Sequence, residues 1–113
     1  MHELSLVCGI IEAACEVMQS NDATQIEEIE LEIGCLTGIE WQAFDLAWQT
    51  AIRNTPLAAA VCHITKKEGK AVCLECERTY SVTSLADACP FCRSYFKNVI
   101  SGEELRIAAL VVK

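Results

Sequence analysis

The chain has 113 residues, 52% of them hydrophobic, which fits one domain of ordinary size with a modest core. Its 16 acidic and 9 basic side chains give a formal net charge of -7, which opposes binding to phosphate backbones, so nucleic acid is not an expected partner. Near the start, Glu3, Glu12 and Glu16 interrupt the apolar residues. We therefore expect neither a signal peptide nor a membrane span, and a cytoplasmic protein.

The first half of the chain predicts a helix followed by a strand. Apolar residues at spacings of three and four predict a helix over about residues 4–20. They are Leu4, Val7, Cys8, Ile11, Cys15 and Met18. Next comes an alternation of period two, which predicts a half-buried strand with a solvated glutamate face. Its apolar members are Ile29, Leu31 and Ile33, and its acidic members are Glu28, Glu30 and Glu32.

A second amphipathic helix is predicted after Gly34. Thr37 and Glu40 have the S/T-x-x-E spacing of a capping box, in which the first residue caps the helix. The apolar stripe that follows consists of Trp41, Phe44, Trp48 and Ile52. Such a stripe is more often core than partner surface, and the helix should end near Asn54 and Pro56.

Two further strands are predicted in the body of the protein. Residues 60–67 predict one strand, and the polar residues 68–70 then mark a break. Residues 105–112 are apolar on both faces, which predicts a buried strand that returns to the sheet of the first domain. His63 is expected to have a surface role or a satisfied hydrogen bond rather than a metal.

Two CxxC pairs, Cys73–Cys76 and Cys89–Cys92, predict a tetrahedral zinc site. Four thiolates leave no open coordination position, so the expected role of zinc is structural. A rubredoxin-like iron site ranks low because that pattern has Gly after each CxxC, where this chain has Glu77 and Arg93. Dithiol redox chemistry ranks low because no helix N-terminus is predicted beside either pair. The other cysteines, Cys8, Cys15, Cys35 and Cys62, are expected to pack in the core.

The predicted fold class is therefore α/β (α+β), with two amphipathic helices packed on a small β-sheet and an inserted zinc-ribbon domain. The predicted domains are 1–68 plus 102–113 for the α/β body and 69–101 for the ribbon, which includes a short strand at Thr79–Val82. A segment as short as the ribbon usually needs a metal to fold.

The amino terminus is a second candidate metal site. The Met1 amine, the His2 amide nitrogen and the His2 imidazole can close two fused chelate rings, and Glu3 could add its amide or its carboxylate. Planar, nitrogen-rich coordination suits Ni(II) or Cu(II), and sequence alone does not choose between them. The alternative is an ordinary solvated helix start.

Three features together resemble the HypA/HybF family of hydrogenase maturation factors. They are MHELSL at the start, LEIG at residues 31–34 with Leu36, and the cysteine quartet followed by a terminal strand. The resemblance covers essentially the whole chain. It implies a nickel metallochaperone for [NiFe]-hydrogenase assembly that cooperates with the maturation GTPase HypB and the hydrogenase large subunit.

The resemblance also assigns residues by position. His2 is implied as the principal nickel ligand, with the Met1 amine and the Glu3 amide beside it. The implied zinc ligands are Cys73, Cys76, Cys89 and Cys92. Glu40 is a candidate accessory nickel contact, although its capping-box spacing gives a competing role.

The main alternative is a zinc-ribbon interaction adaptor without a nickel role. A nucleic-acid-binding ribbon is disfavoured by the acidic charge. No Ser-His-Asp order, phosphate-binding glycine loop or spaced carboxylate pair indicates catalysis, so we expect a non-enzyme. The expected oligomeric state is a monomer or a weak homodimer.

Overall fold

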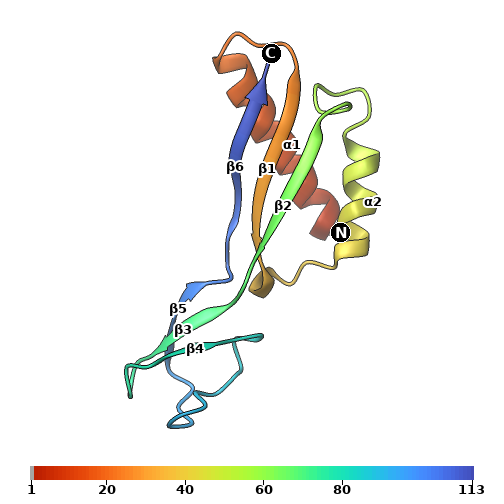
Figure 1. Ribbon diagram of the computed structural model, residues 1–113. Coiled ribbons are helices and arrows are strands. Elements are labelled where there is room, and N and C mark those ends of the chain that lie inside the picture. The colour runs from red at the N-terminus through yellow and green to blue at the C-terminus, as the bar shows by residue number, and fades with distance from the viewer. Residues whose placement is uncertain (1) are drawn as a thin grey trace. The chain divides into compact units, whose positions relative to one another are not determined.

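The computed structural model describes residues 2–113, which form two helices, a short 3-10 turn and six strands (Figure 1). The helices are α1 (His2–Ser20) and α2 (Trp41–Ala51), and the 3-10 turn η1 is Cys35–Thr37. The strands are β1 (Ile26–Gly34), β2 (Val61–Lys67), β3 (Lys70–Cys73), β4 (Thr79–Ser81), β5 (Lys97–Ser101) and β6 (Leu105–Val112). In the described chain, no helix is long and apolar enough to span a membrane.

Two compact units divide the described chain. The first contains the residues up to Leu31, Ile39–Ile64 and Arg106–Lys113. The second contains Glu32–Gly38 and Thr65–Leu105. The predicted domain limits, 1–68 plus 102–113 and 69–101, stay a prediction.

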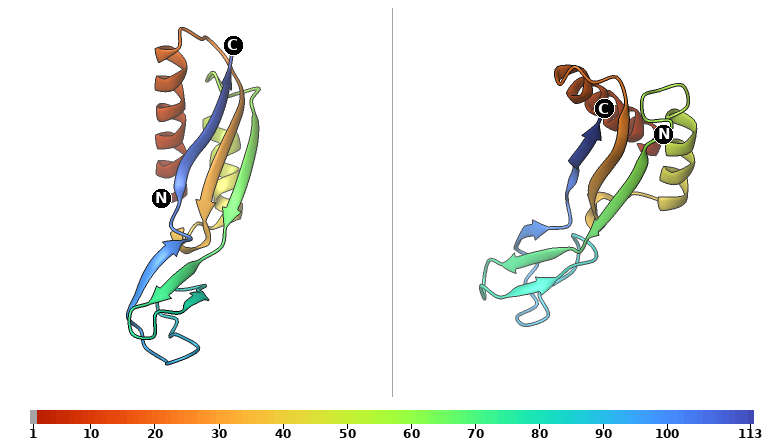
Figure 2. Two further views of the ribbon diagram at one scale, coloured as in Figure 1. Left: turned by 60° about the vertical axis from the view of Figure 1, so that its left-hand side comes forward. Right: turned by 45° about the horizontal axis from the view of Figure 1, so that its top comes forward.

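A three-stranded sheet of order β2-β1-β6 carries the two helices. In Figure 2 the arrows of β1 and β2 point the same way, and the arrow of β6 points the opposite way. The link from β1 through α2 to β2 is therefore a crossover of the βαβ kind, which parallel neighbours require. This arrangement confirms the predicted α+β class.

The buried face of α1 shares Val7 and Met18 with the predicted stripe but differs from it in the other residues. It consists of Glu3, Val7, Ala14 and Met18, which recur at intervals of four and seven residues. Leu4 and Cys8 follow Glu3 and Val7 by one residue, a rotation of about 100° around the helix, and both are exposed. The apolar spacing of three and four therefore located the helix, but tertiary packing buries only part of the predicted stripe.

Strand β6 joins the sheet as predicted, but the prediction of a buried strand is wrong. It pairs only with β1 and so forms one edge of the sheet, and Leu105 and Val111 are exposed. Every residue of β6 is exposed or half-buried, so neither face of this edge strand is fully covered. On the central strand β1, Glu28 and Glu30 are exposed, which confirms the predicted wet face.

The predicted capping box before α2 is also wrong. Thr37 lies in η1, where its Oγ1 donates to the carbonyl of Gly34 at 2.8 Å. Gly38 then adopts a left-handed conformation (φ 76°), which ends the 3-10 turn before the helix begins. Glu40 itself is the N-cap, since its carboxylate accepts from the N–H groups of Gln42 at 3.2 Å and Ala43 at 2.8 Å.

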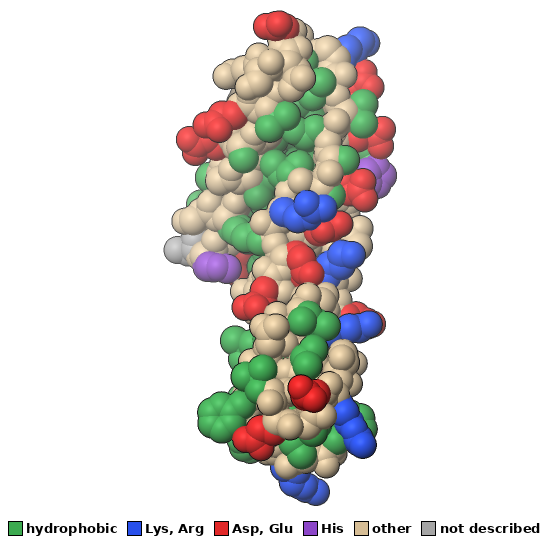
Figure 3. Space-filling model, turned by 90° about the vertical axis from the view of Figure 1, so that its left-hand side faces the viewer, with side chains coloured by type: hydrophobic (Ala, Val, Ile, Leu, Met, Phe, Trp, Pro, Cys, Tyr) green, Lys and Arg blue, Asp and Glu red, His purple; other side chains and the backbone are tan. Residues whose placement is uncertain are grey.

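The second unit contains an antiparallel sheet of order β4-β3-β5. Its buried cluster is small and consists of Ala71, Cys73, Tyr80, Val82 and Cys89. Several large hydrophobic side chains remain exposed instead, and Figure 3 shows hydrophobic side chains on the visible surface of the protein. They include Leu74, Leu85, Phe91, Tyr95, Phe96 and Ile100. So small a core agrees with the expectation that this segment needs a metal.

Candidate functional site

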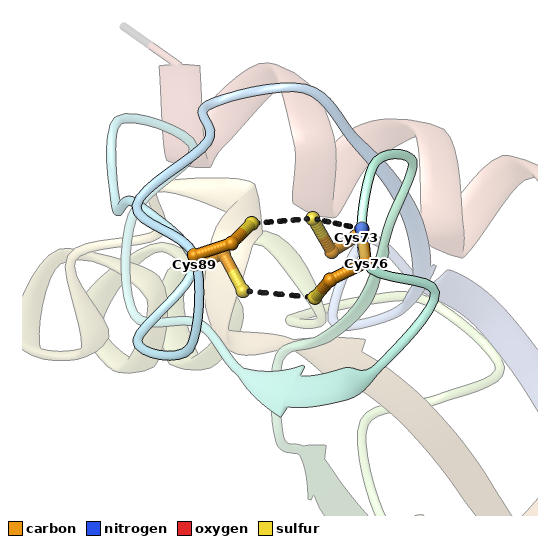
Figure 4. Close-up of side chains that lie close together, drawn as sticks. Cys73, Cys76 and Cys89 are labelled. Atoms are coloured by element: carbon orange, nitrogen blue, oxygen red, sulfur yellow. Dashed lines mark hydrogen bonds between the residues drawn. The ribbon is translucent and has the colours of Figure 1, made fainter.

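The four cysteines of the two CxxC pairs converge in the second unit (Figure 4). The sulfurs of Cys73 and Cys92 lie 3.5 Å apart, and those of Cys76 and Cys89 lie 3.6 Å apart. All four sulfurs lie within 4.8 Å of one another. Each close contact joins one pair to the other, so the two turns face each other around a common centre.

Both turns have the same backbone geometry. In the first, the N–H of Glu77 donates to the carbonyl of Cys73 at 3.0 Å, and in the second, the N–H of Arg93 donates to that of Cys89 at 2.8 Å. Glu77 and Arg93 have positive φ angles of 63° and 67°. The left-handed conformation at the residue after each CxxC explains why glycine suits this position. Here two charged residues adopt it instead, at some conformational cost.

The thiols differ in acidity because their hydrogen bonds differ. The N–H of Cys76, which lies 3.5 Å from the sulfur of Cys73, is the main cause that lowers the pKa of Cys73 to about 6. The N–H of Ser94 acts to lower the pKa of Cys92. Contact with the Cys73 thiol and burial outweigh this effect and raise the pKa of Cys92 to about 12. Within the closest pair, the hydrogen bonds therefore favour the charged form of Cys73 and the neutral form of Cys92.

The donor set and its spacing fit zinc. Four ligands at about 2.3 Å in a tetrahedron place neighbouring sulfurs about 3.8 Å apart. The two close contacts are slightly shorter than this, and the remaining separations reach at most 4.8 Å, so small movements would complete the shell. Such a shell holds an ion without a vacant position for substrate, which is the arrangement of a structural site.

The predicted amino-terminal site begins at the first turn of α1. Met1 lies outside the described residues. The side chain of His2 is 63% exposed, and its Nδ1 lies 3.6 Å from Oε2 of Glu3. Glu3 is buried, and the same oxygen accepts a hydrogen bond from the N–H of Glu40 at 3.2 Å. This N–H is the largest of the influences that lower the pKa of Glu3, so its carboxylate is held in the charged form.

Glu40 is engaged as the cap of α2 rather than displayed toward His2. Its two carboxylate oxygens accept from Gln42 and Ala43, and its own N–H is the group that donates to Glu3. The accessory nickel role of Glu40 stays a prediction. The contact between Glu3 and Glu40 has no signal in the sequence, because two residues 37 positions apart have no characteristic spacing that would indicate it.

The remaining candidates have ordinary surroundings. The prediction that Cys8 and Cys35 pack in the core is wrong, since both are exposed, while Cys15 and Cys62 are half-buried. His63 has the satisfied surface role that was expected, because its Nε2 lies 3.0 Å from Oε1 of Glu28. Among residues 2–113, the CxxC quartet is the one group of three or more His, Cys, Asp or Glu side chains that lie close enough together to hold a metal ion.

Comparison with known proteins gives one family. Residues 1–112 match the family described as HypA, hydrogenase/urease nickel incorporation, metallochaperone. The hydrogenase maturation factor HypA of Parabacteroides distasonis is 37% identical over 113 residues, covering 100% of this chain and 98% of that protein. The factor of the same name from Alkalilimnicola ehrlichii is 37% identical over 112 residues, covering 99% of each chain.

The fold is shared with a solved structure. The solution structure of the Ni metallochaperone HypA from Helicobacter pylori has a TM-score of 0.71 with this chain at 22% sequence identity. The match covers 97% of this chain and 96% of that one. Taken with the four converging cysteines, the full-length match confirms the resemblance drawn from the sequence, and the chain belongs to the HypA family of nickel metallochaperones for hydrogenase maturation.

Proposed function

We propose that this protein binds Ni(II) at its amino terminus and delivers it during [NiFe]-hydrogenase maturation, while zinc at Cys73, Cys76, Cys89 and Cys92 holds the second unit folded. Nickel is the cargo and zinc is a resident structural ion. The nickel ligands are the His2 imidazole and amide, the Met1 amine and the Glu3 amide. The partners are the maturation GTPase HypB and the hydrogenase large subunit, and the site of action is the cytoplasm.

The position of His2 carries the proposal. Its imidazole is exposed on the first turn of α1, where the first four backbone N–H groups of a helix have no acceptor within the helix. The amide nitrogens of His2 and Glu3 can therefore lose their protons to nickel without breaking a helical hydrogen bond. Deprotonation is required for ligation, so nickel affinity should rise with pH.

The buried carboxylate of Glu3 supports the same site. It lies beside Nδ1 of His2 and is fixed by the N–H of Glu40, so one negative charge stands next to the place where a divalent cation would bind. Because the His2 side chain itself is exposed, few packed groups would have to move when the ion leaves. Both properties suit a carrier that must bind its cargo and then release it.

The test is a calorimetric Ni(II) titration of the zinc-loaded, full-length chain at pH 7.5. Four proteins are compared: the native chain, a chain with Gly-Ser added before Met1, His2→Ala, and His63→Ala. The extension moves the terminal amine out of the chelate, and His2→Ala removes the imidazole. His63 is the matched control, because it is the other histidine of the chain and lies on β2 with Glu28 as its partner.

The expected result is tight one-to-one binding by the native chain and His63→Ala, and its loss in the other two. Equal binding by all four, or by none, would contradict the terminal site. The delivery step is tested by hydrogenase activity in cells that carry His2→Ala as their sole copy. If that variant is folded and zinc-loaded and still supports maturation, the alternative of a zinc-ribbon adaptor without a nickel role is correct.

A further inference from the structure

One buried polar group in the second unit has no partner of its own. Among residues 2–113, the hydroxyl oxygen of Tyr80 is a buried side-chain atom without a hydrogen bond. The whole residue is 6% exposed, so water does not satisfy this group from the surface. A buried hydroxyl that loses its hydrogen bond to water without gaining another destabilises the folded state. Such a group calls for a physical explanation.

The surroundings of Tyr80 supply a candidate acceptor. Tyr80 lies on β4 opposite Ala71 of β3, and two residues beyond Ala71 is Cys73. Side chains two apart on a strand point to the same face, so Tyr80 and Cys73 share one side of the sheet. Tyr80 packs in the same buried cluster as Cys73 and Cys89.

The electrostatics favour a neutral donor at this position. Burial raises the pKa of Tyr80, and the nearby thiol groups of Cys89, Cys73 and Cys92 raise it further, followed by Asp87. An ordinary phenol is already protonated at neutral pH, so the hydroxyl of Tyr80 is available as a neutral donor. A zinc ion with four thiolates carries a net charge of about -2, and hydrogen bonds to the sulfurs are the usual means of stabilising that charge.

We propose that Tyr80 is a positioning residue of the zinc site, whose hydroxyl donates a hydrogen bond to one of the buried thiolates, Cys73 or Cys89, when zinc is bound. The hydroxyl of Tyr80, which has no other hydrogen-bond partner in the described chain, then gains an acceptor when zinc binding makes the sulfur anionic. The inference rests on the proposed zinc site. If that site were wrong, the native chain itself would fail to bind zinc tightly, which is distinct from an effect confined to Tyr80.

The test compares the full-length variants Tyr80→Phe and Tyr95→Phe. Tyr95 is the matched control, because it lies in the same unit but is 66% exposed. Zinc affinity is measured by competition with a chromophoric chelator, and Co(II) is used as a spectroscopic probe of the thiolates. Loss of a hydrogen bond to a metal ligand typically weakens metal affinity by about tenfold to a hundredfold. We expect that loss, and a shifted thiolate-to-cobalt absorption band, in Tyr80→Phe alone.

The metal-free state gives a second readout. Because the second unit is expected to unfold without zinc, Tyr80→Phe should leave the unfolding midpoint of the metal-free chain, which then reports the first unit, equal to that of the native metal-free chain. If Tyr80→Phe binds zinc with native affinity and shows the native cobalt spectrum, the proposal is overturned. An equal loss in Tyr95→Phe would overturn it as well.

A measurement on the native chain covers the case in which Tyr80→Phe does not fold. With ¹¹³Cd in place of zinc, a hydrogen bond from the hydroxyl to a ligating sulfur produces a scalar coupling between the hydroxyl proton and the metal. We expect a slowly exchanging Tyr80 hydroxyl proton that is coupled to ¹¹³Cd. A hydroxyl proton without this coupling, or one that exchanges too fast to detect, would place the partner of Tyr80 elsewhere and refute the role.

Discussion

The carboxylate of Glu3 accepts a hydrogen bond from the backbone N–H of Glu40 at 3.2 Å and thereby joins the first turn of α1 to the start of α2. Glu40 uses its own carboxylate to cap α2, so two acidic side chains organise the beginnings of two helices in the first unit. Both carboxylates lie near helix N-termini, where the helix dipole favours negative charge. His2 lies next to these contacts, because its Nδ1 is 3.6 Å from Oε2 of Glu3.

The first prediction concerns the pH dependence of stability through Glu3. The N–H of Glu40 lowers the pKa of Glu3 in the folded state, so this carboxylate stabilises the fold above the ordinary glutamate pKa of about 4.3. That contribution is lost as the pH falls through the lower, folded-state pKa. Between pH 7 and pH 3, Glu3→Gln should therefore lose less stability than the native chain. Denaturant unfolding followed by tryptophan fluorescence reports the first unit, because both tryptophans lie in α2.

Glu12→Gln is the control for that measurement, since Glu12 is an exposed glutamate of the same helix. It should keep the pH dependence of the native chain. If Glu3→Gln were as acid-sensitive as Glu12→Gln, the contact with Glu40 would not stabilise the protein.

The second prediction separates capping from metal binding at Glu40. Glu40→Ala removes the acceptor of the Gln42 and Ala43 N–H groups and should lower the free energy of unfolding by about 1 kcal/mol. Glu40→Ser keeps a capping oxygen but removes the carboxylate, so it should recover most of this stability and retain native nickel affinity. Native stability together with weakened nickel binding in Glu40→Ser would instead make Glu40 a nickel contact.

The third prediction concerns the glycine of the LEIG segment. The N–H of Gly34 donates to the carbonyl of Glu104 at 2.8 Å, and a Cβ at position 34 would collide with the carbonyl group of Gly102. Because backbone atoms cannot move aside as a flexible side chain can, Gly34→Ala should lower the free energy of unfolding by about 1–3 kcal/mol or more.

Gly9 is the contrasting position, since a Cβ there meets nothing within 4 Å in the interior of α1. Gly9→Ala should raise stability by about 0.5–1 kcal/mol, and equal effects of both substitutions in urea unfolding would contradict this reading.

The fourth prediction concerns cysteines outside the zinc site. Burial, with a smaller influence from Asp45, raises the pKa of Cys62 to about 11. Only the thiolate reacts with alkylating agents, so at pH 8 Cys62 should react about a hundredfold more slowly than a thiol of ordinary pKa. Exposed Cys8 and Cys35 should be modified first. Mass spectrometry of timed alkylation of the zinc-loaded protein measures each site, and early labelling of Cys62 would refute the prediction.

The fifth prediction concerns zinc removal. The second unit has few buried side chains, so a chelator should unfold it and make Cys73, Cys76, Cys89 and Cys92 reactive. The first unit has its own core around Phe44 and Trp48, and the tryptophan fluorescence should change little. Hydrogen exchange before and after chelation measures both units. Retained protection in β3, β4 and β5 without metal would show that zinc is not needed for folding.

The sequence determined those features that depend on residues close together in the chain. The period of three to four located both helices, the alternation of Ile29, Leu31 and Ile33 located β1, and the two CxxC turns located the quartet. These predictions succeeded because a helix, a strand and a tight turn are each defined by neighbouring residues. The family followed from the combination of these local features.

Tertiary structure decided what depends on segments far apart in the chain. It chose the row of α1 that is buried, placed β6 at the edge of the sheet, set Gly34 against Gly102 and joined Glu3 to Glu40. It also left the hydroxyl of Tyr80 without a partner beside the buried cysteines. None of these relations has a sequence period or a fixed spacing, because each results from how the surfaces of separate elements fit together once their apolar side chains leave water.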